Sequence, residues 1–276
     1  MKETARFKIY KHISSLLLVA FTLIPFGILM VTSLRSSEDL GRKGPISLPD
    51  AIVWSNYPKA WELGNFSTYF KNSMICMAAT VTFVLVLALL GAYVLSFHEF
   101  FGKQVLISVI MLGVLIPFTQ IMIPLFHTLK GMNLLNTLWA IILPQTAMQI
   151  PFSVFLMRGF MRDLPKSVIE SARLDGANEV QTLFYIVTPL VRPALVALLI
   201  FTAVSSWNNF MLPTVMIQKD ALRTVPVGLN YFKDQHFTNF PMMCAAANII
   251  IVPILLVYLT FQQKMIQGMT VGSLKG

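Results

Sequence analysis

The stretch "ESARLDGANEVQTLFYIVTP", residues 170–189, is a polar interruption in a chain that is otherwise strongly apolar. Of the 276 residues, 56% are hydrophobic and only 12% are charged, whereas roughly 25% are charged in an ordinary soluble domain. Such a composition is typical of an integral membrane protein. We therefore interpret the region around this stretch, residues 159–192, as a folded loop between membrane spans and call it the polar loop.

Six apolar stretches are long enough to cross a bilayer, which takes about 20 residues of α-helix. They cover roughly residues 13–34, 72–97, 105–129, 134–157, 193–217 and 243–262. The predicted fold is thus an all-α integral membrane protein with six transmembrane helices. The first stretch has the basic start of a signal peptide. We nevertheless expect a retained span, because its apolar core is too long and no cleavage site follows before Ser36.

The basic residues predict the orientation, because lysines and arginines near span ends concentrate on the cytoplasmic side. With the N-terminus inside, 12 of the 21 lysines and arginines lie in inner segments, and the basic run from Lys2 to Lys11 favours the same choice. We expect both termini and the polar loop to face the cytoplasm. The net charge of +9 fits contact with anionic membrane lipid. No basic patch is interleaved with aromatic residues, so nucleic acid is not an expected partner.

The polar loop has the pattern of two short amphipathic helices joined by a tight turn. Apolar residues recur at helical spacing in each half: Leu164, Val168, Ile169 and Ala172 in the first, and Val180, Leu183, Phe184 and Val187 in the second. Pro165 suits the start of the first helix, where its missing N–H costs nothing. Asp175 and Gly176 are expected to end it, because glycine readily adopts the left-handed conformation found after many helices.

The second helix of the loop also carries boundary signals. Asn178 and Gln181 have the spacing of a capping box, and Pro189 and Pro193 are expected to end the helix before the next span. The two helices are too polar to cross the membrane and too apolar to remain bare. Two interpretations stay open. The pair packs back under its own helix bundle, or it inserts into a groove on a protein partner.

Motifs for several kinds of chemistry are missing from the sequence. All 12 acidic residues lie in loops or at span edges, whereas proton-driven carriers usually need a carboxylate within the membrane. No GxxxxGK[ST] motif is present, so we expect no ATP hydrolysis by this chain. The four histidines are scattered, and both cysteines lie in apolar stretches, so neither a metal site nor a catalytic site is expected. If the chain moves a solute, the energy comes from another subunit.

The polar loop resembles the "EAA" loop of importer permeases of the ATP-binding-cassette (ABC) superfamily, whose pattern is roughly EAA-x-x-DGA followed by a hydrophobic-x-LP. The matching residues are Glu170, Ala172, Asp175, Gly176, Ala177, Phe184, Ile186 and Pro189. Ser171 replaces the middle alanine, and Thr188 replaces the leucine before the proline. Further stretches, "LLGAYVLSF" and "IPLFHTLKGMNLLNTLWAIILP", look like sugar-importer permeases. "SWNNFMLPTVMI", "LRTVPVGLNYF" and "GMTVGSLKG" resemble the second permease of maltose-type carbohydrate importers, so the resemblance runs from about residue 70 to the end.

The resemblance implies the type I ABC importer permease fold, in the inner (plasma) membrane of a bacterial cell. It divides the chain into an N-terminal region (1–69), a permease core (70–262) that includes the polar loop, and a C-terminal tail (263–276) expected to lie by the ATPases. It implies five kinds of partner. The protein partners are a homologous second permease in a heterodimer, two ATP-binding-cassette ATPase subunits that bind ATP and Mg, and an extracytoplasmic sugar-binding protein. The other two are a sugar (in particular an oligosaccharide) and membrane lipid. No cofactor is expected on this chain itself.

The resemblance also assigns a role to the polar loop, which forms coupling helices in a cleft of the ATPase in that family. The implied coupling residues are Glu170, Ser171, Ala172, Asp175, Gly176, Ala177, Phe184 and Pro189.

Polar residues at membrane depth give a second candidate site, at Trp207, Asn208 and Asn209 in the fifth predicted span. Buried amides need partners, so they either bond between helices or contact the sugar, with Trp207 stacking on its ring. Prolines in the spans either kink the helices for packing or line a path. The loop at 218–242 is either an ordinary solvated loop or a contact for the binding protein.

Other functions stay open from the sequence. The chain could be a permease for another small polar solute or a secondary carrier that works alone. It could also be a membrane scaffold that docks a cytoplasmic protein without transport. ATP-dependent uptake that needs the ATPase subunits separates the importer from the last two.

Overall fold

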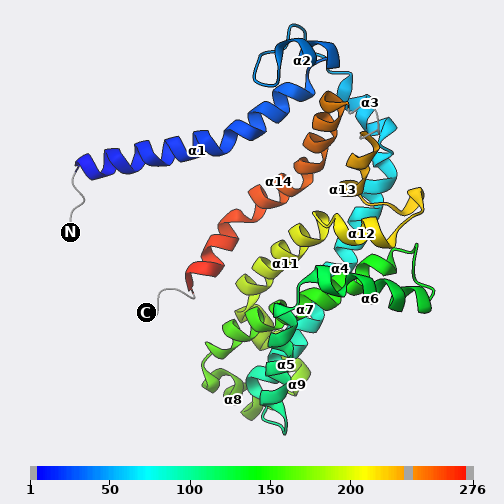
Figure 1. Cartoon of the computed structure of the whole chain (residues 1–276). Coiled ribbons are helices and arrows are strands. Elements are labelled where there is room, and N and C mark those ends of the chain that lie inside the picture. Colours follow the sequence, from blue (N-terminus) through cyan, green and yellow to red (C-terminus); the bar gives the residue numbers. More distant parts are fainter. Residues whose placement is uncertain (1–4, 233–238, 272–276) are drawn as a thin grey trace. The chain divides into compact units, whose positions relative to one another are not determined.

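A computed structural model describes residues 5–232 and 239–271, and all regular elements in these ranges are helices (Figure 1). The all-α prediction is confirmed. Four helices are long and apolar enough to cross a membrane, at Tyr10–Ser33, Phe66–Phe97, Trp139–Arg162 and Phe240–Thr260. Two bent helix pairs raise the number to six if each pair counts as one span.

The chain divides into two compact units, residues 1–67 with 228–252 and residues 68–227 with 253–276. The helices of the first unit are α1 (Ala5–Ser33), α2 (Ser37–Lys43), α3 (Asn56–Leu63), η3 (Leu229–Phe232) and the first part of α14 (Phe240–Val271). The predicted division at residues 69 and 262 stays a prediction.

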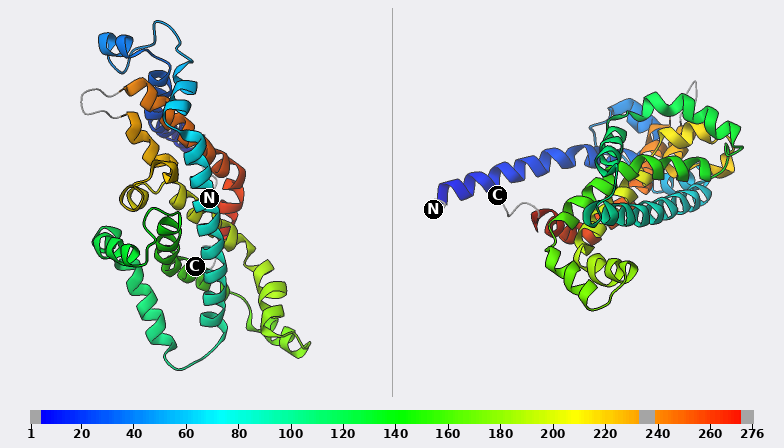
Figure 2. Two further views of the ribbon diagram at one scale, coloured as in Figure 1. Left: turned by 90° about the vertical axis from the view of Figure 1, so that its right-hand side faces the viewer. Right: turned by 90° about the horizontal axis from the view of Figure 1, so that it is seen from below.

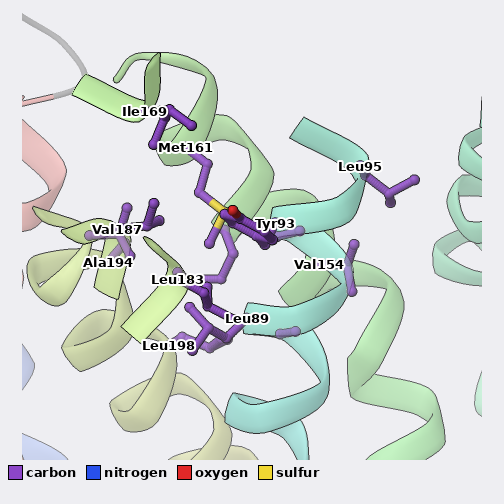
Figure 3. Packing of buried hydrophobic residues seen from close by; sticks show 14 of the residues in the cluster. Leu89, Tyr93, Leu95, Val154, Met161, Ile169, Leu183, Val187, Ala194 and Leu198 are labelled. Carbon is purple, nitrogen blue, oxygen red and sulfur yellow. The ribbon is translucent and has the colours of Figure 1, made fainter. Parts of the chain in front are cut away.

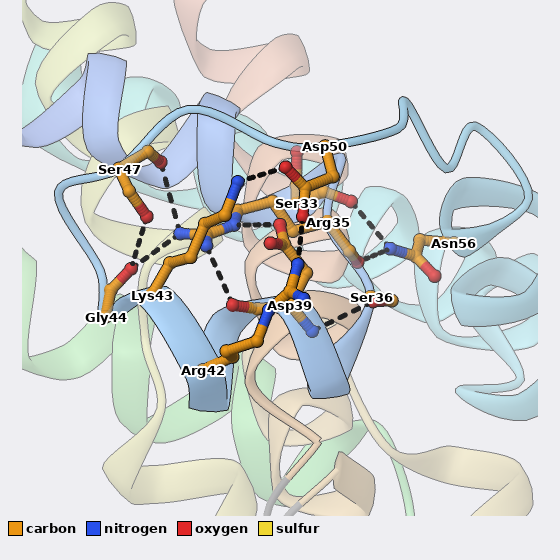
Figure 4. A network of polar contacts seen from close by, with 10 residues as sticks. All are labelled: Ser33, Arg35, Ser36, Asp39, Arg42, Lys43, Gly44, Ser47, Asp50 and Asn56. Carbon is orange, nitrogen blue, oxygen red and sulfur yellow. Dashed lines mark hydrogen bonds and ion pairs between the residues drawn. The ribbon is translucent and has the colours of Figure 1, made fainter.

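A buried arginine organises the connection between α1 and α3 (Figure 4). Arg35 is fully buried, and its guanidinium donates to the Asp39 carboxylate at 2.8 Å and to the carbonyls of Gly44 and Ser47 at 2.6 and 3.1 Å. The Asn56 amide donates to the carbonyl of Arg35 at 2.8 Å. Buried charged groups are normally paired and hydrogen-bonded, and Arg35 meets this requirement through Asp39 of α2 and the carbonyls that follow α2.

The second unit contains the candidate site. Its helices are α4 (Phe66–Phe97), α5 (Lys103–Leu115), α6 (Phe118–Gly131), α7 (Trp139–Arg162), α8 (Lys166–Leu174), α9 (Glu179–Gln181), η1 (Thr182–Val187), α10 (Thr188–Leu190), α11 (Arg192–Trp207), α12 (Met211–Met216), η2 (Asp220–Leu222) and α13 (Val225–Gly228). Helices α5 and α11 both pack on α7. The polar loop projects as a hairpin of short helices between α7 and α11 (Figure 2).

One apolar core joins the spans to the polar loop (Figure 3). It includes Leu89 and Tyr93 of α4, Met161 of α7 and Leu198 of α11. The polar loop adds Ile169, Leu183 and Val187 to the same cluster. Burial of such side chains contributes about 1.5–3 kcal/mol each, so the loop is anchored to the bundle by one of its faces.

Two predicted spans are interrupted in the structure. The span at 105–129 consists of α5 and α6, which meet at an angle of 101°. Pro117 precedes α6 with extended backbone, as expected where a proline cannot continue the helical hydrogen bonds. The span at 193–217 is broken after Trp207, and α12 begins only at Met211. Hydropathy did not predict these breaks, because apolar content does not record the direction of a helix.

Candidate functional site

The turn of the polar loop is built around Gly176. Helix α8 ends at Leu174, and Gly176 has φ +83°, in the left-handed region. The Ala177 N–H donates to the Ala172 carbonyl at 3.0 Å, and the Gly176 N–H donates to the Arg173 carbonyl at 3.1 Å. These two bonds form a Schellman motif, which satisfies carbonyls left free at the helix end. The predicted end of the first helix is confirmed.

The second helix of the loop begins with the predicted capping box. The Asn178 side chain accepts from the Gln181 N–H at 2.9 Å, and the Gln181 side chain accepts from the Asn178 N–H at 2.9 Å. Two backbone donors at the helix start are thereby satisfied.

The predicted apolar face of the second helix is wrong in part. Leu183 and Val187 are buried, but Val180 and Phe184 are exposed. Residues Thr182–Val187 form a π-helix, whose wider turn displaces the faces from their α-helical positions. The helix ends at Leu190, between Pro189 and Pro193, and α11 begins at Arg192 with a bend of 79°, so the predicted end before the next span is confirmed.

The loop therefore has a packed face and a bare face. The first-helix stripe is confirmed, because Ile169 and Ala172 are buried and Leu164 and Val168 are half-buried. Several apolar side chains of the loop are exposed, and those on the two helices nearest the turn, which we call the exposed loop face, are Leu174, Val180, Phe184 and Tyr185. Leu174 is 88% exposed and Tyr185 is 76% exposed. An exposed apolar group amid charged residues is typical of an interaction surface.

The turn forms a shallow hollow of about 360 Å³ next to this face. It is lined by Asp175, Gly176, Ala177, Gln181, Tyr185 and Ile186. Three residues implied by the family pattern, at 175–177, thus gather at one place. Glu170, Ser171, Phe184 and Pro189 lie on the loop surface outside this lining. Within the part of the chain that the structure describes, no cation lies within 4 Å of the Glu170 carboxylate.

Glu179, which the sequence did not single out, is the centre of a polar cluster. Its carboxylate accepts from the Tyr93 hydroxyl at 2.6 Å and from the Arg173 guanidinium at 2.9 Å. The His98 Nε2 lies 3.4 Å from the same carboxylate. The Tyr93 hydrogen bond, more than the Arg173 and His98 side chains, holds the pKa of Glu179 below its usual value. No sequence spacing connects α4 with this loop, so only the tertiary structure reveals the cluster.

The second candidate site, at Trp207, Asn208 and Asn209, lies at the end of α11 that is farther from the polar loop. Helix α11 has 16 residues, so the two groups are separated by about 22 Å along its axis. Trp207 is buried, with its ring edge-on to Phe70 at 5.4 Å between centroids. Asn208 is exposed, and the Asn209 side chain accepts from the Leu212 N–H at 3.2 Å. Their contact with a substrate stays a prediction.

A buried glutamine, also missed from the sequence, joins three helices near this group. The Gln145 Oε1 of α7 accepts from the Ser206 hydroxyl of α11 at 2.7 Å and from the Thr80 hydroxyl of α4 at 3.2 Å. All three residues are buried. A lone glutamine in an apolar helix gives no signal of its partners. Polar bonds between helices are therefore part of what holds this end of the bundle together.

Two predicted features lie wholly or partly outside the described residues. These are the end of the tail, residues 272–276, and the part of the 218–242 loop that holds Lys233 and Asp234. Within the described ranges, no three His, Cys, Asp or Glu side chains are grouped as a metal site would require.

Comparison with known proteins identifies the family. The sequence profile of the family described as binding-protein-dependent transport system inner membrane component matches residues 86–271. The chain belongs to this family. It is therefore a membrane-spanning permease component of a transport system that works with a binding protein.

Two curated relatives of this permease are similar over almost their whole length. The diacetylchitobiose uptake system permease protein NgcG of Streptomyces coelicolor is 31% identical, with 98% of this chain and 90% of the relative covered. The arabinooligosaccharides transport system permease protein AraQ of Halalkalibacterium halodurans is 33% identical, with 90% and 89% covered.

A solved structure has the same fold as the permease. It is a chain from the crystal structure of a bacterial ABC transporter involved in the import of the acidic polysaccharide alginate, with a TM-score of 0.78 and 23% identity. The match covers 95% of this chain and 99% of that chain. The predicted type I ABC importer permease fold is confirmed.

Proposed function

We propose that the permease forms half of the transmembrane path of an ABC importer for an oligosaccharide. The two relatives named above are permeases for diacetylchitobiose and arabinooligosaccharides, and the matching structure comes from an alginate importer. These solutes share a chain of hydroxyl-rich rings. A homologous second permease supplies the other half of the path, and an extracytoplasmic binding protein delivers the sugar.

We further propose that two separate ATPase subunits, which bind ATP and Mg, drive the transport through the polar loop. The observation that carries this proposal is the exposed loop face, the apolar residues Leu174, Val180, Phe184 and Tyr185 of the two helices that Gly176 joins. Apolar residues of a helical hairpin that are bare on one side suit a groove on a protein partner. In this arrangement the polar loop and both chain termini face the cytoplasm, and this chain has no ATPase activity of its own.

Cysteine crosslinking tests the docking of the loop. The native cysteines are first replaced. Val180→Cys and Phe184→Cys are then each expected to crosslink, in membranes that contain the complete transporter, to a cysteine introduced into the groove of the ATPase subunit. Val105→Cys is the matched control, because Val105 is also apolar and is 67% exposed against 64% for Val180, but belongs to α5. Crosslinking at Val105 alone, or at no loop position with Mg-ATP present, would refute the docking proposal.

Uptake into vesicles tests the substrate class and the energy source. The complete transporter is expected to accumulate labelled diacetylchitobiose or arabinotriose only with ATP on the ATPase side and with its binding protein outside. Uptake of another polar solute, with no competition by either sugar, would move the assignment to a permease for that solute. Accumulation without the ATPase subunits would establish a secondary carrier instead.

Under the same proposal, Trp207, Asn208 and Asn209 are the candidate contacts for the sugar in the transmembrane path. The exposed amide of Asn208 is suited to bond sugar hydroxyls, since each amide offers two donors and one acceptor oxygen. Trp207 packs against Phe70 here, so stacking on a sugar requires a state in which one ring face is uncovered. Asn208→Ala is expected to raise the half-saturating sugar concentration for uptake while leaving ATPase docking intact.

A further inference from the structure

Tyr93 connects the polar loop to a membrane span that is distant in sequence. Its hydroxyl donates to the Glu179 carboxylate at 2.6 Å, and the two residues are 86 positions apart. Within the described residues, the only other side-chain bond between the loop and α4 or its end is the 3.4 Å contact of His98 with the same carboxylate. Every such polar link therefore ends on Glu179.

The α4 side of the link is rigid. Tyr93 is buried, and its ring lies in the apolar core beside Met161 (Figure 3), with the Phe97 ring at 5.4 Å and the His98 ring at 5.5 Å between centroids. A tightly packed ring has few rotamers available, so its hydroxyl keeps its direction.

Two further contacts hold the loop side of the link. Glu179 is the first residue of its helix, directly after Asn178, whose capping box with Gln181 fixes the start of that helix. Arg173, from the other loop helix, holds the second carboxylate oxygen at 2.9 Å. The carboxylate thus ties both helices of the loop to one hydroxyl on α4.

The hydrogen bond between Tyr93 and Glu179 differs from the surrounding apolar contacts in its direction and strength. Apolar contacts allow helices to slide, because dispersion and burial have little directional preference. A hydrogen bond to a carboxylate is directional and roughly twice as strong as one between neutral groups. We propose that Tyr93, acting through Glu179, is the positioning residue that makes α4 move with the polar loop. This inference rests on the proposed docking of the loop on the ATPases.

Helix α4 is well placed to carry such a movement. It has 32 residues and is about 48 Å long, longer than the hydrocarbon core of a bilayer. A displacement at its Tyr93 end therefore reaches the opposite side of the membrane in one rigid element.

The test compares hydrogen exchange in the complete transporter, with its ATPase subunits, before and after Mg-ATP is added. One reporter is the loop amide of Ala177, bonded to the Ala172 carbonyl, and the other is the His98 amide, bonded to the Val94 carbonyl at the end of α4. In the wild type both amides are expected to change. In Tyr93→Phe the loop response remains, and the His98 response falls about fivefold, as expected for a lost hydrogen bond to a partly solvated charge.

Tyr57→Phe is the matched control. It also removes one tyrosine hydroxyl, which lies 2.9 Å from the Ser33 hydroxyl and 3.1 Å from the Asn248 amide. All three residues belong to the first unit, whereas the polar loop belongs to the second. It is expected to leave both responses unchanged. An equal loss of the His98 response in Tyr57→Phe, or a full response in Tyr93→Phe, overturns the inference.

A double variant tests whether Tyr93 acts through Glu179. Tyr93→Phe added to Glu179→Ala is expected to cause no further loss of the His98 response, because Glu179→Ala already removes the acceptor of the Tyr93 hydroxyl and the contact of His98. A further loss of similar size shows independent effects and also overturns the inference. If the wild-type loop itself does not respond to Mg-ATP, the proposed docking fails, and that result is distinct from a loop response without an α4 response.

Discussion

Gly176→Ala is expected to loosen the polar loop through backbone strain alone. Gly176 has φ +83°, and a Cβ atom added there would meet no atom within 4 Å. The added methyl group therefore clashes with nothing except its own backbone. A non-glycine residue in the left-handed region costs about 1–2 kcal/mol. The equilibrium between the closed and opened turn should shift toward the opened turn by about 5- to 30-fold.

Hydrogen exchange measures this shift directly. The Ala177 amide is protected by its bond to the Ala172 carbonyl, which exists only while the turn is closed. Its exchange in Gly176→Ala should be faster than in the wild type by the same factor, since exchange reports local opening. Gly176→Val should be more severe, because a β-branched residue resists positive φ, and ATP-driven uptake should be lost. Gly176→Asn should be milder than either, because asparagine tolerates this conformation.

Gly159→Ala is the control for this experiment. Gly159 also has no atom within 4 Å of an added Cβ, but it lies inside α7 without positive φ. Alanine there should stabilise the helix by about 1 kcal/mol and leave Ala177 exchange unchanged. Unchanged exchange in Gly176→Ala, or equal acceleration in Gly159→Ala, would show that strain at this turn is not what keeps glycine there.

Three further results are expected. Asn178→Ala removes the capping-box acceptor and should destabilise the second loop helix by about 1 kcal/mol, seen as faster exchange of the Gln181 amide; unaltered exchange would contradict this. Gln145→Leu leaves the buried hydroxyls of Ser206 and Thr80 without their acceptor, so the detergent-solubilised protein should melt at a lower temperature than the wild type, and an unchanged Tm would argue against this role. The hydrogen bond from Arg35 lowers the pKa of the Asp39 carboxyl below its ordinary value of 3.8. The ionised carboxylate therefore stabilises the fold above pH 3.8, and this stabilisation is lost as the pH falls from 3.8 through the lowered pKa. Exchange of the Gly44 amide, corrected for the intrinsic rate, should become faster with acid in the wild type but not in Asp39→Asn.

The sequence predicted those parts of the loop that depend on local chemistry. The Gly176 turn and the Asn178 cap need only particular residue types at fixed spacing, and both are as expected. The buried stripe of the first helix followed from α-helical periodicity. The second helix failed this rule at Val180 and Phe184, because periodicity assumes 3.6 residues per turn and the π-helix departs from it.

Contacts between distant segments were beyond the sequence. Neither Tyr93 with Glu179 nor Gln145 with Ser206 has a spacing that reports proximity, since each pair depends on how whole helices pack. The broken spans failed for a related reason. Hydropathy recorded enough apolar residues around Pro117, but not that α5 and α6 would meet at 101°.

The π-helical turn has a consequence for aligning this chain with its relatives. A π turn holds about one residue more than an α turn, so residues 182–187 contain a natural place for an insertion or deletion. A homologue one residue shorter between Asn178 and Val191 can keep the same cap and the same bend by winding this segment as ordinary α-helix. Alignment gaps therefore belong inside 182–187, and a gap placed at the glycine turn would pair residues that are not structurally equivalent.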